Sequence, residues 1–511
     1  MSVFFCIKCL ILLLLEVIHF DLNQQDQKNK EVFIMRFIEL FYVIFNIVLL
    51  GWLVCGRNKS QRGMLMAGSM SILFLLVHGI IEGMRWQMMP TYLMTLFFLA
   101  IVVIRHFFNP KIQKEQRSSM RRLRVVLNST LTVLYSAIAV SLPIALPVFT
   151  FEKPVGPYKI GTITYDWKDN QREETLTPEP GDKRELMVQI WYPANTNAKG
   201  NTAPYISDAA VFAEGYSKIL NLPKFLFTNF GYVKTHAIEN AEISNQETTY
   251  PVLLFSHGFS GHKNQNTFQI EQLVSQGYIV VGIDHTYSST TSVFSDGRIA
   301  NYVPQKTESI AYLDKANEGW VEDAKFVLDQ VEQLAQNDPE NRFTGRMDME
   351  NIGMFGHSFG GATSTQMLMT DSRIKAALNM DGVLYGKLRV PADGLKKPFM
   401  MMSADDSIRE AKETDGKEFI EFVNETLPRY EYVTVGGNYW MKIKDMKHMG
   451  FSDLYLFSPL YERMEGVDIQ KAYRLINDYS LDFFNHYLKH QPFKLLEQNI
   501  GDYPEFTLQK G

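Results

Sequence analysis

The chain has 511 residues, a formal net charge of −5 and 46% hydrophobic residues. This composition excludes a disordered chain, a collagen-like chain and a disulfide-stabilised scaffold. The charge is uneven, because residues 35–150 hold 12 Lys/Arg against 3 Asp/Glu, and this +9 leaves −14 for the rest of the chain. The acidic remainder is unsuited to a polyanion, so we expect no nucleic-acid partner.

All three cysteines, Cys6, Cys9 and Cys55, lie in the first 55 residues. Cys6 and Cys9 have C-x-x-C spacing, but they sit in an apolar N-terminal run, which disfavours a redox or metal role. The rest of the chain can form neither a disulfide nor a cysteine-based metal site.

Four apolar runs follow one another, at Phe37–Val54, Met64–Ile81, Met88–Ile104 and Val125–Phe149. A helix needs about 17–25 mainly apolar residues to cross a bilayer. A buried helical domain of a soluble protein is the alternative, but four such runs in succession favour a membrane. We therefore predict an integral membrane domain at 35–150 with four transmembrane helices.

The loop charges predict the orientation of these spans. Basic residues gather in the loops after the first and third spans, whereas the turn at 82–87 holds only Arg85. These basic residues are Arg57, Lys59, Arg62, Arg105, Lys111, Lys114, Arg117, Arg121, Arg122 and Arg124. Because positive loops remain in the cytoplasm, we expect a multi-pass cell-membrane protein whose chain after Phe149 is extracytoplasmic. His78 and Glu82 are then expected to be solvated residues at the outer end of the second span.

Residues 1–34 allow three interpretations. Leu10–Leu15 is strongly apolar but short, and Lys8 and Glu16 flank it. The segment is a signal-like sequence, an extra span, or non-native sequence upstream of a true start at Met35. An extra span would leave the orientation of the other four unchanged.

The pattern changes after residue 150, where short β-rich runs alternate with helical stretches. Such alternation is typical of an α/β fold with a mostly parallel central sheet. The predicted strands are Tyr158–Tyr165, Leu186–Tyr192, Val252–Ser256, Tyr278–Ile283, Asn351–Phe355, Ile374–Met380, Phe399–Ser403 and Tyr439–Lys444, and the predicted helices are Ala311–Gln336 and Arg409–Thr426. We therefore expect one α/β domain over 151–511.

A G-x-S-x-G pentapeptide, Gly356-His357-Ser358-Phe359-Gly360, lies between the run Asn351–Phe355 and the helix-forming stretch Ala362–Thr370. Strand, pentapeptide and helix in this order are the context of a nucleophile elbow. The glycines permit a sharp turn that residues with a Cβ adopt poorly. The motif predicts an α/β-hydrolase fold with Ser358 as the nucleophile.

A serine nucleophile needs a general base and an orienting acid, which follow it in this fold in the order Asp/Glu, then His. After Ser358 the only histidines are His448, His486 and His490. His486 and His490 lie four residues apart on an amphipathic helix and are expected on the surface. His448, on the loop after the last strand, is therefore the predicted base.

Three aspartates are candidates for the acid. Asp381 ends the strand after the nucleophile, and Asp405 and Asp406 end the strand after that. The later strand is the commoner acid position in the wider fold. The residues alone therefore favour Asp405 or Asp406 slightly over Asp381.

The oxyanion of ester hydrolysis is stabilised by main-chain N–H groups. Phe359 follows the nucleophile, and Phe259 lies in the loop after an early strand, so these two residues are the predicted donors. We interpret His257, His262 and the pair Asp284-His285 as structural, and we expect neither a metal nor a cofactor.

Five ordered motifs resemble those of the platelet-activating factor acetylhydrolase family of single-chain serine lipases. They are Pro154-Val155-Gly156-Pro157-Tyr158, Leu186-Met187-Val188-Gln189-Ile190-Trp191-Tyr192-Pro193-Ala194, Phe255-Ser256-His257-Gly258, Gly356-His357-Ser358-Phe359-Gly360-Gly361-Ala362-Thr363 and His448-Met449-Gly450-Phe451-Ser452-Asp453. The resemblance implies that Asp381 is the acid, with Asp405 and Asp406 in reserve. It also implies that Phe259 and Phe359 are the oxyanion donors, although the family usually has a smaller aliphatic residue at Phe259.

The resemblance implies a calcium-independent serine ester hydrolase that uses Ser358, His448 and Asp381. The membrane anchor is predicted from the four apolar runs and has no counterpart in the animal enzymes of that family. The implied substrates are lipid or small esters with short or oxidised acyl chains. Val211–Phe227 is rich in aromatic and aliphatic residues and is either a lid or ordinary core packing. The alternatives are another α/β-hydrolase, such as a dienelactone-hydrolase-like esterase or a peptidase, and a non-enzymatic membrane protein that kept the fold.

Overall fold

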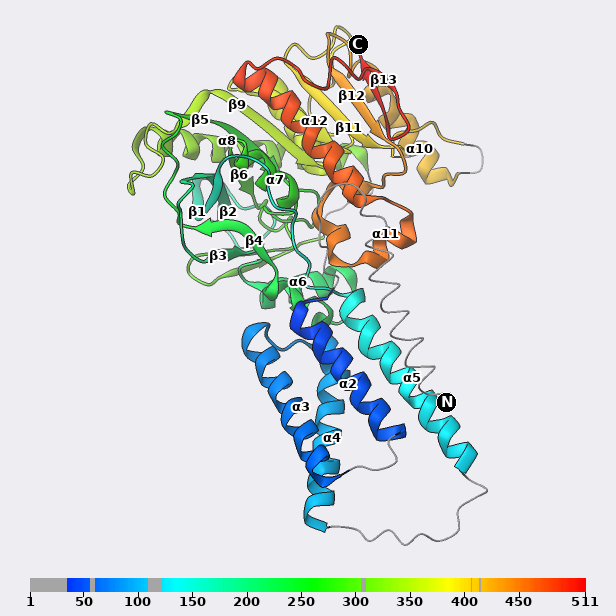
Figure 1. Ribbon diagram of the computed structural model, residues 1–511. Coiled ribbons are helices and arrows are strands. Elements are labelled where there is room, and N and C mark those ends of the chain that lie inside the picture. The colour runs from blue at the N-terminus through cyan, green and yellow to red at the C-terminus, as the bar shows by residue number, and fades with distance from the viewer. Residues whose placement is uncertain are drawn as a thin grey trace. The chain divides into compact units, whose positions relative to one another are not determined.

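The computed structural model describes residues 35–55, 60–108, 121–177, 179–304, 309–405, 407–412 and 415–511. The chain divides between Phe149 and Thr150 into two compact units (Figure 1). The interpretations of residues 1–34, the basic loop residues Arg57, Lys59, Lys111, Lys114 and Arg117, and the reserve acid Asp406 lie outside the described residues.

The first unit consists of helices, drawn in blue to cyan in Figure 1. They are α2 (Phe37–Cys55), α3 (Gln61–Ile81), the short 3₁₀ helix η1 (Trp86–Met88), α4 (Met89–Phe108) and α5 (Arg121–Ala145). Four of them are long and apolar enough to cross a membrane, which confirms the predicted number of spans. The last helix ends at Ala145 instead of Phe149, and Pro147 follows its end.

A buried ion pair connects the ends of these helices. Arg85 donates from Nε and Nη2 to the two carboxylate oxygens of Glu39 at 2.7 and 2.8 Å. Arg36 donates to the same carboxylate at 2.6 Å, and Arg85 also donates to the carbonyl oxygen of Leu146 at 2.6 Å. Opposite charges removed together from water compensate each other's desolvation. The pair thus links α2, the turn before α4 and the chain just after α5.

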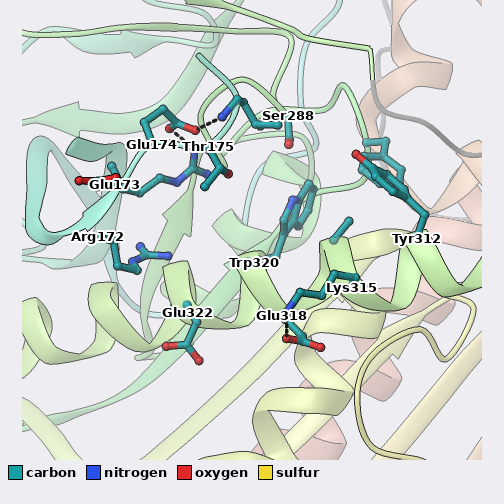
Figure 2. Close-up of a pocket in the computed structure, with 15 residues that line it drawn as sticks. Arg172, Glu173, Glu174, Thr175, Ser288, Tyr312, Lys315, Glu318, Trp320 and Glu322 are labelled. Atoms are coloured by element: carbon teal, nitrogen blue, oxygen red, sulfur yellow. Dashed lines mark hydrogen bonds and ion pairs between the residues drawn. The ribbon is translucent and has the colours of Figure 1, made fainter. Parts of the chain in front are cut away.

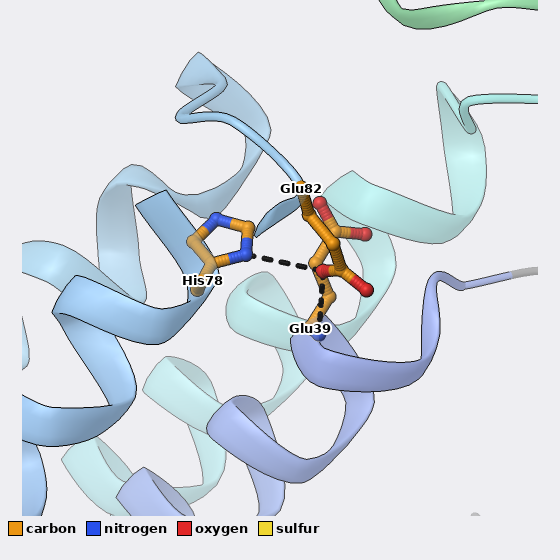
Figure 3. A group of neighbouring side chains, drawn as sticks. All are labelled: Glu39, His78 and Glu82. Carbon is orange, nitrogen blue, oxygen red and sulfur yellow. Dashed lines mark hydrogen bonds and ion pairs between the residues drawn. The ribbon is translucent and has the colours of Figure 1, made fainter. Parts of the chain in front are cut away.

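Glu82 and His78 extend this cluster, as Figure 3 shows. The Glu82 carboxylate accepts the N–H groups of Ile38 and Glu39 at the start of α2, at 2.8 and 3.1 Å. His78 Nδ1 lies 3.2 Å from Glu82, and its Nε2 lies 2.7 Å from the hydroxyl of Tyr92. His78 has no exposed surface. Its prediction as a solvated residue is therefore wrong, because these partners replace water.

The same cluster has the spacing of a metal site. The potential ligand atoms of Glu39, His78 and Glu82 lie within 4.8 Å of one another. However, Glu39 is already paired with two guanidinium groups, from Arg36 and Arg85. A divalent cation would face these positive charges, so the arrangement fits an ion-pair cluster better than a metal site.

The second unit is built on a twelve-stranded sheet with the order β13-β14-β12-β11-β10-β9-β5-β6-β2-β1-β4-β3. Neighbouring strands from β6 to β12 in this order are parallel, whereas β2 and β14 join them antiparallel. The strands are β1 (Lys159–Glu173), β2 (Lys183–Ala194), β3 (Thr202–Pro204), β4 (Lys234–Glu239), β5 (Tyr250–Ser256), β6 (Ile279–Ile283), β9 (Met347–His357), β10 (Ile374–Met380), β11 (Phe399–Ala404), β12 (Tyr439–Ile443), β13 (Gly501–Asp502) and β14 (Phe506–Lys510). A separate hairpin pairs β7 (Thr291–Val293) with β8 (Ile299–Asn301).

Helices cover both faces of this sheet (Figure 1). On one face lie α7 (Thr267–Ser275) and α12 (Ile469–Lys489), and on the other lie α8 (Ile310–Asn337) and α9 (Phe359–Thr370). The remaining helices are α6 (Ala209–Leu220), η2 (Lys224–Tyr232), α10 (Lys417–Thr426), η3 (Leu427–Tyr430), η4 (His448–Phe451), η5 (Asp453–Phe457) and α11 (Pro459–Glu465). Strands buried on both faces are mainly apolar, and the core forms between such strands and the apolar sides of α8 and α9. The layered, mostly parallel sheet confirms the predicted α/β-hydrolase fold.

The stretch predicted to be a lid or core packing divides between these two roles. It covers α6 and the start of η2. Phe212 is buried, whereas Leu222 and Phe225 are exposed. Part of the stretch therefore packs in the core, and part presents apolar side chains to the surroundings.

Candidate active site

The nucleophile elbow lies between β9 and α9. Ser358 has φ 56° and ψ −122°, a conformation that is costly for a residue with a Cβ. Its N–H donates to the carbonyl oxygen of Met380 at 2.9 Å. A Cβ at Gly360 would lie 2.0 Å from the carbonyl oxygen of Ser256, so only glycine fits where the two main chains approach. The strained turn is thereby held at the carboxyl end of the central strand.

The loops after β10 and β12 bring an aspartate and a histidine to this serine. His448 Nε2 lies 3.0 Å from Ser358 Oγ, and His448 Nδ1 lies 2.7 Å from Asp381 Oδ2. A carboxylate only accepts, so Nδ1 carries the proton and the Nε2 lone pair faces the hydroxyl. The structure thus brings together the predicted nucleophile, base and acid, and their catalytic roles remain predictions.

Asp381 is buried and has three donors. Besides His448, the N–H of Ala404 donates to Oδ1 at 2.9 Å and the hydroxyl of Ser407 donates to Oδ2 at 2.8 Å. Burial raises the pKa of Asp381, but the hydrogen bond and charge of His448, together with the other two donors, outweigh it and lower the pKa below its usual value. The group is therefore a carboxylate at neutral pH. Nothing in the sequence spacing had pointed to Ser407.

The reserve acids differ from Asp381 in their surroundings. Asp405 is exposed in the turn after β11. In the described part of the chain it makes no hydrogen bond to His448, whereas the preceding residue, Ala404, supplies its N–H to Asp381. Asp406 lies outside the described residues. The geometry therefore favours the acid that the family resemblance implies.

Two main-chain N–H groups lie beside the serine. Phe359 is the first residue of α9, and Phe259 follows β5 in the loop that passes Ser358. A Cβ at Gly258 would lie only 3.0 Å from the Cβ of Ser358, which shows how closely this loop approaches the nucleophile. Among the described residues, neither amide has a hydrogen-bond acceptor. Both predicted donors are therefore available to a developing oxyanion.

A buried network that sequence reasoning missed supports this loop. Asp323 of α8 accepts two hydrogen bonds from Arg184, at 3.0 and 2.6 Å, and lies 2.9 Å from His285 Nδ1. His285 Nε2 lies 2.8 Å from Ser256 Oγ, at the end of β5. Burial raises the pKa of Asp323, but Arg184 and His285 outweigh it and hold the pKa far below its usual value. Ser256, His285 and Asp323 repeat the atom pattern of a hydrolytic triad, yet all three are buried, so their role is structural.

A cavity of about 570 Å³ borders the loop of Phe259 (Figure 2). Phe259, Tyr312 and Trp320 give it aromatic walls, and Arg172 and Glu174 lie among its charged lining residues. Its lining comes from the β1–β2 hairpin, the loops after β5 and β6, and α8. The strands among these elements, β1, β2, β5 and β6, lie on the opposite side of β9 from β12, the strand that precedes His448 in the chain.

The fold has a solved counterpart. The ferulic acid esterase from Streptomyces cinnamoneus superposes with a TM-score of 0.57 and 26% sequence identity, over 71% of this chain and 99% of that chain. A hydroxyl, an imidazole and a buried carboxylate in one hydrogen-bonded row, beside two free N–H groups, suit acyl transfer. Fold and site together define the class: this chain is a carboxylic-ester hydrolase on an α/β-hydrolase fold.

The sequence comparisons narrow this class to one family. The family described as "Platelet-activating factor acetylhydrolase, isoform II" matches residues 147–341 and 311–501. The platelet-activating factor acetylhydrolase of Cavia porcellus is 23% identical over 367 residues, which cover 66% of this chain and 78% of that protein. The chain therefore belongs to the platelet-activating factor acetylhydrolase family.

Other relatives match over shorter stretches. A probable 1-alkyl-2-acetylglycerophosphocholine esterase of Arthroderma benhamiae is 32% identical over 149 residues, which are 29% of this chain and 35% of that protein. The platelet-activating factor acetylhydrolase of Canis lupus familiaris is 27% identical over 225 residues, covering 38% of this chain and 49% of that protein. The chain thus spans half or less of the length of these two relatives.

Proposed function

We propose that this protein is a membrane-anchored serine ester hydrolase with Ser358 as nucleophile, His448 as base and Asp381 as orienting acid. The observation that carries the proposal is the hydrogen-bonded row from Ser358 Oγ through His448 to Asp381, with distances of 3.0 and 2.7 Å. The free N–H groups of Phe259 and Phe359 beside it support oxyanion stabilisation.

The proposed reaction has two stages. Ser358 Oγ attacks the ester carbonyl carbon while His448 Nε2 takes the hydroxyl proton, and the N–H groups of Phe259 and Phe359 stabilise the tetrahedral oxyanion. The imidazolium then gives its proton to the leaving alkoxide, which departs as an alcohol. Water, deprotonated by His448, attacks the acyl-enzyme and releases the acid, with the proton returning to Ser358.

We propose short-chain or phospholipid-type esters as substrates. The names of the relatives support this choice, since they include an acetylhydrolase and a 1-alkyl-2-acetylglycerophosphocholine esterase. Each proton and charge in the scheme is handled by a side chain or amide of this chain, so we propose that the reaction is independent of calcium. Attachment to a membrane would hold the site close to amphiphilic esters.

Esters with an aromatic acyl group are a second candidate substrate class. The cavity that borders Phe259, a proposed oxyanion donor, has aromatic walls from Tyr312 and Trp320. The solved counterpart with 26% identity is a ferulic acid esterase. An aromatic acid would stack on such walls.

The location is proposed from the loop charges. Four helices are long and apolar enough to cross a membrane. The basic loops after the first and third spans favour a cytoplasmic position for those loops. We therefore propose that residues 151–511 form an extracytoplasmic catalytic domain and residues 35–150 its membrane domain.

A fluorophosphonate probe tests the proposed nucleophile directly. The full-length chain in detergent should be labelled, and Ser358→Ala should not be. Labelling of Ser358→Ala as strong as that of the wild type would refute the serine assignment. The same preparation should hydrolyse p-nitrophenyl acetate equally well with EDTA or calcium, and a loss of activity in EDTA would refute calcium independence.

An acyl-chain series separates the substrate classes. If short-chain esters are preferred, kcat/KM for nitrophenyl esters should fall from acetate to longer chains. If aromatic acids are preferred, methyl ferulate should exceed methyl acetate, and Trp320→Ala should remove that preference more than the acetate activity. Cleavage of peptides without cleavage of either ester class would instead support a peptidase.

A further inference from the structure

Two buried histidines lie next to the oxyanion loop, and the proposed mechanism uses neither. His257 immediately precedes Gly258, and His357 immediately precedes Ser358. Both are at most 1% exposed. Buried imidazoles require defined hydrogen-bond partners, and the partners here lead to the two peptide groups that flank Gly258.

His257 holds the carbonyl group of the peptide between Gly258 and Phe259. The N–H of His285 donates to His257 Nε2 at 3.2 Å. A main-chain N–H can only donate, so Nε2 carries the lone pair and Nδ1 carries the proton. His257 Nδ1 lies 2.6 Å from the carbonyl oxygen of Gly258 and donates to it, and the N–H of Gly261 donates to the same oxygen at 2.9 Å.

The orientation of this carbonyl group fixes the oxyanion donor. In a planar trans peptide the C=O of one residue and the N–H of the next point in opposite directions. The C=O of Gly258 and the N–H of Phe259 belong to one such unit. Two donors on the Gly258 oxygen therefore direct the Phe259 N–H away from them, into the space beside Ser358.

His357 holds the other side of Gly258 through Gln265. The carbonyl oxygen of His448 can only accept, so His357 Nε2, at 2.9 Å, donates to it. His357 Nδ1 then accepts from Gln265 Nε2 at 2.9 Å, and Gln265 Oε1 accepts the N–H of Gly258 at 3.1 Å. The row from the His448 carbonyl through His357 and Gln265 to the Gly258 N–H begins with an obligatory acceptor and ends with an obligatory donor. Only one arrangement of its protons satisfies both ends.

We propose that His257, His357 and Gln265 are positioning residues that hold the two peptide groups flanking Gly258 and so orient the N–H of Phe259 for oxyanion binding, and that His357 and Gln265 couple Gly258 to the backbone of His448. The inference rests on the proposed function. Burial, followed by the neighbouring His285 for one and His448 for the other, lowers the pKa of both histidines to about 3, in keeping with neutral imidazoles.

The test compares variants that differ in which hydrogen bond they keep. His257→Asn retains a donor near the position of Nδ1, whereas His257→Leu retains none. Gln265→Met removes both bonds of the amide at similar length. His486→Gln, at a half-buried position of α12 outside the proposed site, is the matched control. All are measured as full-length chains in detergent, with active sites titrated by the fluorophosphonate.

Loss of one oxyanion donor lowers kcat by about 10²–10³-fold. A donor that is present but misdirected should lower kcat by a smaller factor. We expect His257→Leu and Gln265→Met to lower kcat by about 10–100-fold with little change in KM. Affinity for a trifluoromethyl ketone, whose hemiketal carries an oxyanion, should weaken by the same factor. His257→Asn should recover most of the loss, and His486→Gln should match the wild type.

Two results would overturn the proposal. One is unchanged kcat per titrated site and unchanged ketone affinity in both His257→Leu and Gln265→Met, even if their melting temperatures fall. The other is a rise in KM at constant kcat. Where His257→Leu does not accumulate, Gln265→Met and His357→Gln give the same readouts. Failure of the proposed function itself is separate, because the wild type would then resist the fluorophosphonate.

Discussion

Replacement of Asp381 by asparagine tests the acid assignment most sharply. The carboxylate accepts from Ala404 N–H at Oδ1 and from His448 Nδ1 and Ser407 Oγ at Oδ2. If the asparagine oxygen keeps the bond to Ala404, its NH₂ faces His448 Nδ1 and favours the tautomer protonated at Nε2. That tautomer cannot take the proton of Ser358.

The expected loss follows from this inverted tautomer. Such a change lowers kcat by about 10⁴-fold in a hydrolytic triad, equivalent to about 5 kcal/mol at 1.36 kcal/mol per tenfold. The assay is p-nitrophenyl acetate hydrolysis per folded chain, with folding followed by thermal melting. Asp405→Asn is the control and should retain activity within about twofold, because its side chain is exposed. Full activity in Asp381→Asn, with loss in Asp405→Asn or Asp406→Asn, would refute the assignment.

Four further outcomes are expected. Asp323→Asn should lower the free energy of unfolding by about 3–5 kcal/mol at neutral pH. Because the pKa of Asp323 is lowered in the folded state, the difference in unfolding free energy between wild type and variant should shrink in denaturation curves taken below about pH 4. Arg85→Met should lower the melting temperature in detergent by leaving Glu39 buried without its bidentate partner, and the double variant with Glu39→Gln should recover part of the loss. Gly360→Ala should yield little folded or active protein in expression trials, since its Cβ would lie 2.0 Å from a main-chain oxygen. Protease added to intact cells should digest residues 151–511, and protection there would contradict the proposed orientation.

Much of the fold was predictable because the central strands are mainly apolar. Ile374–Met380 was predicted with the bounds that β10 has, since a parallel strand buried on both faces is mainly apolar, here with Lys375 and Asn379 as the exceptions. Short edge elements such as β3, β7 and β13 were not predicted, because two or three residues carry no periodicity. The helix predicted at Arg409–Thr426 begins only at Lys417.

A residue of the candidate site was predictable only where its type and its position in the chain left a single candidate. Ser358 is predicted by its pentapeptide and His448 by chain order. Asp381 and Asp405 end neighbouring strands, so the sequence pattern does not distinguish them as candidates for the acid. What separates them is a backbone detail, the N–H of Ala404 aimed at Asp381. The partners of His357 and Arg184 lie 92 and 139 residues away in sequence, at Gln265 and Asp323. No local pattern encodes such pairs, because they form only when the sheet is complete.

The neutral state of His357 has a kinetic consequence that can be measured. Its ring centroid lies 4.8 Å from that of His448, and a positive charge there would oppose the imidazolium that forms on His448 during acylation. Since its pKa is lowered to about 3, His357 stays neutral above about pH 5. On the acid side of the pH profile, kcat/KM should therefore fall tenfold for each tenfold rise in proton concentration, which indicates one essential base. A second-power dependence between pH 5 and 7 would show that a second histidine titrates with the base, and it would contradict the fixed proton arrangement of His357, Gln265 and Gly258.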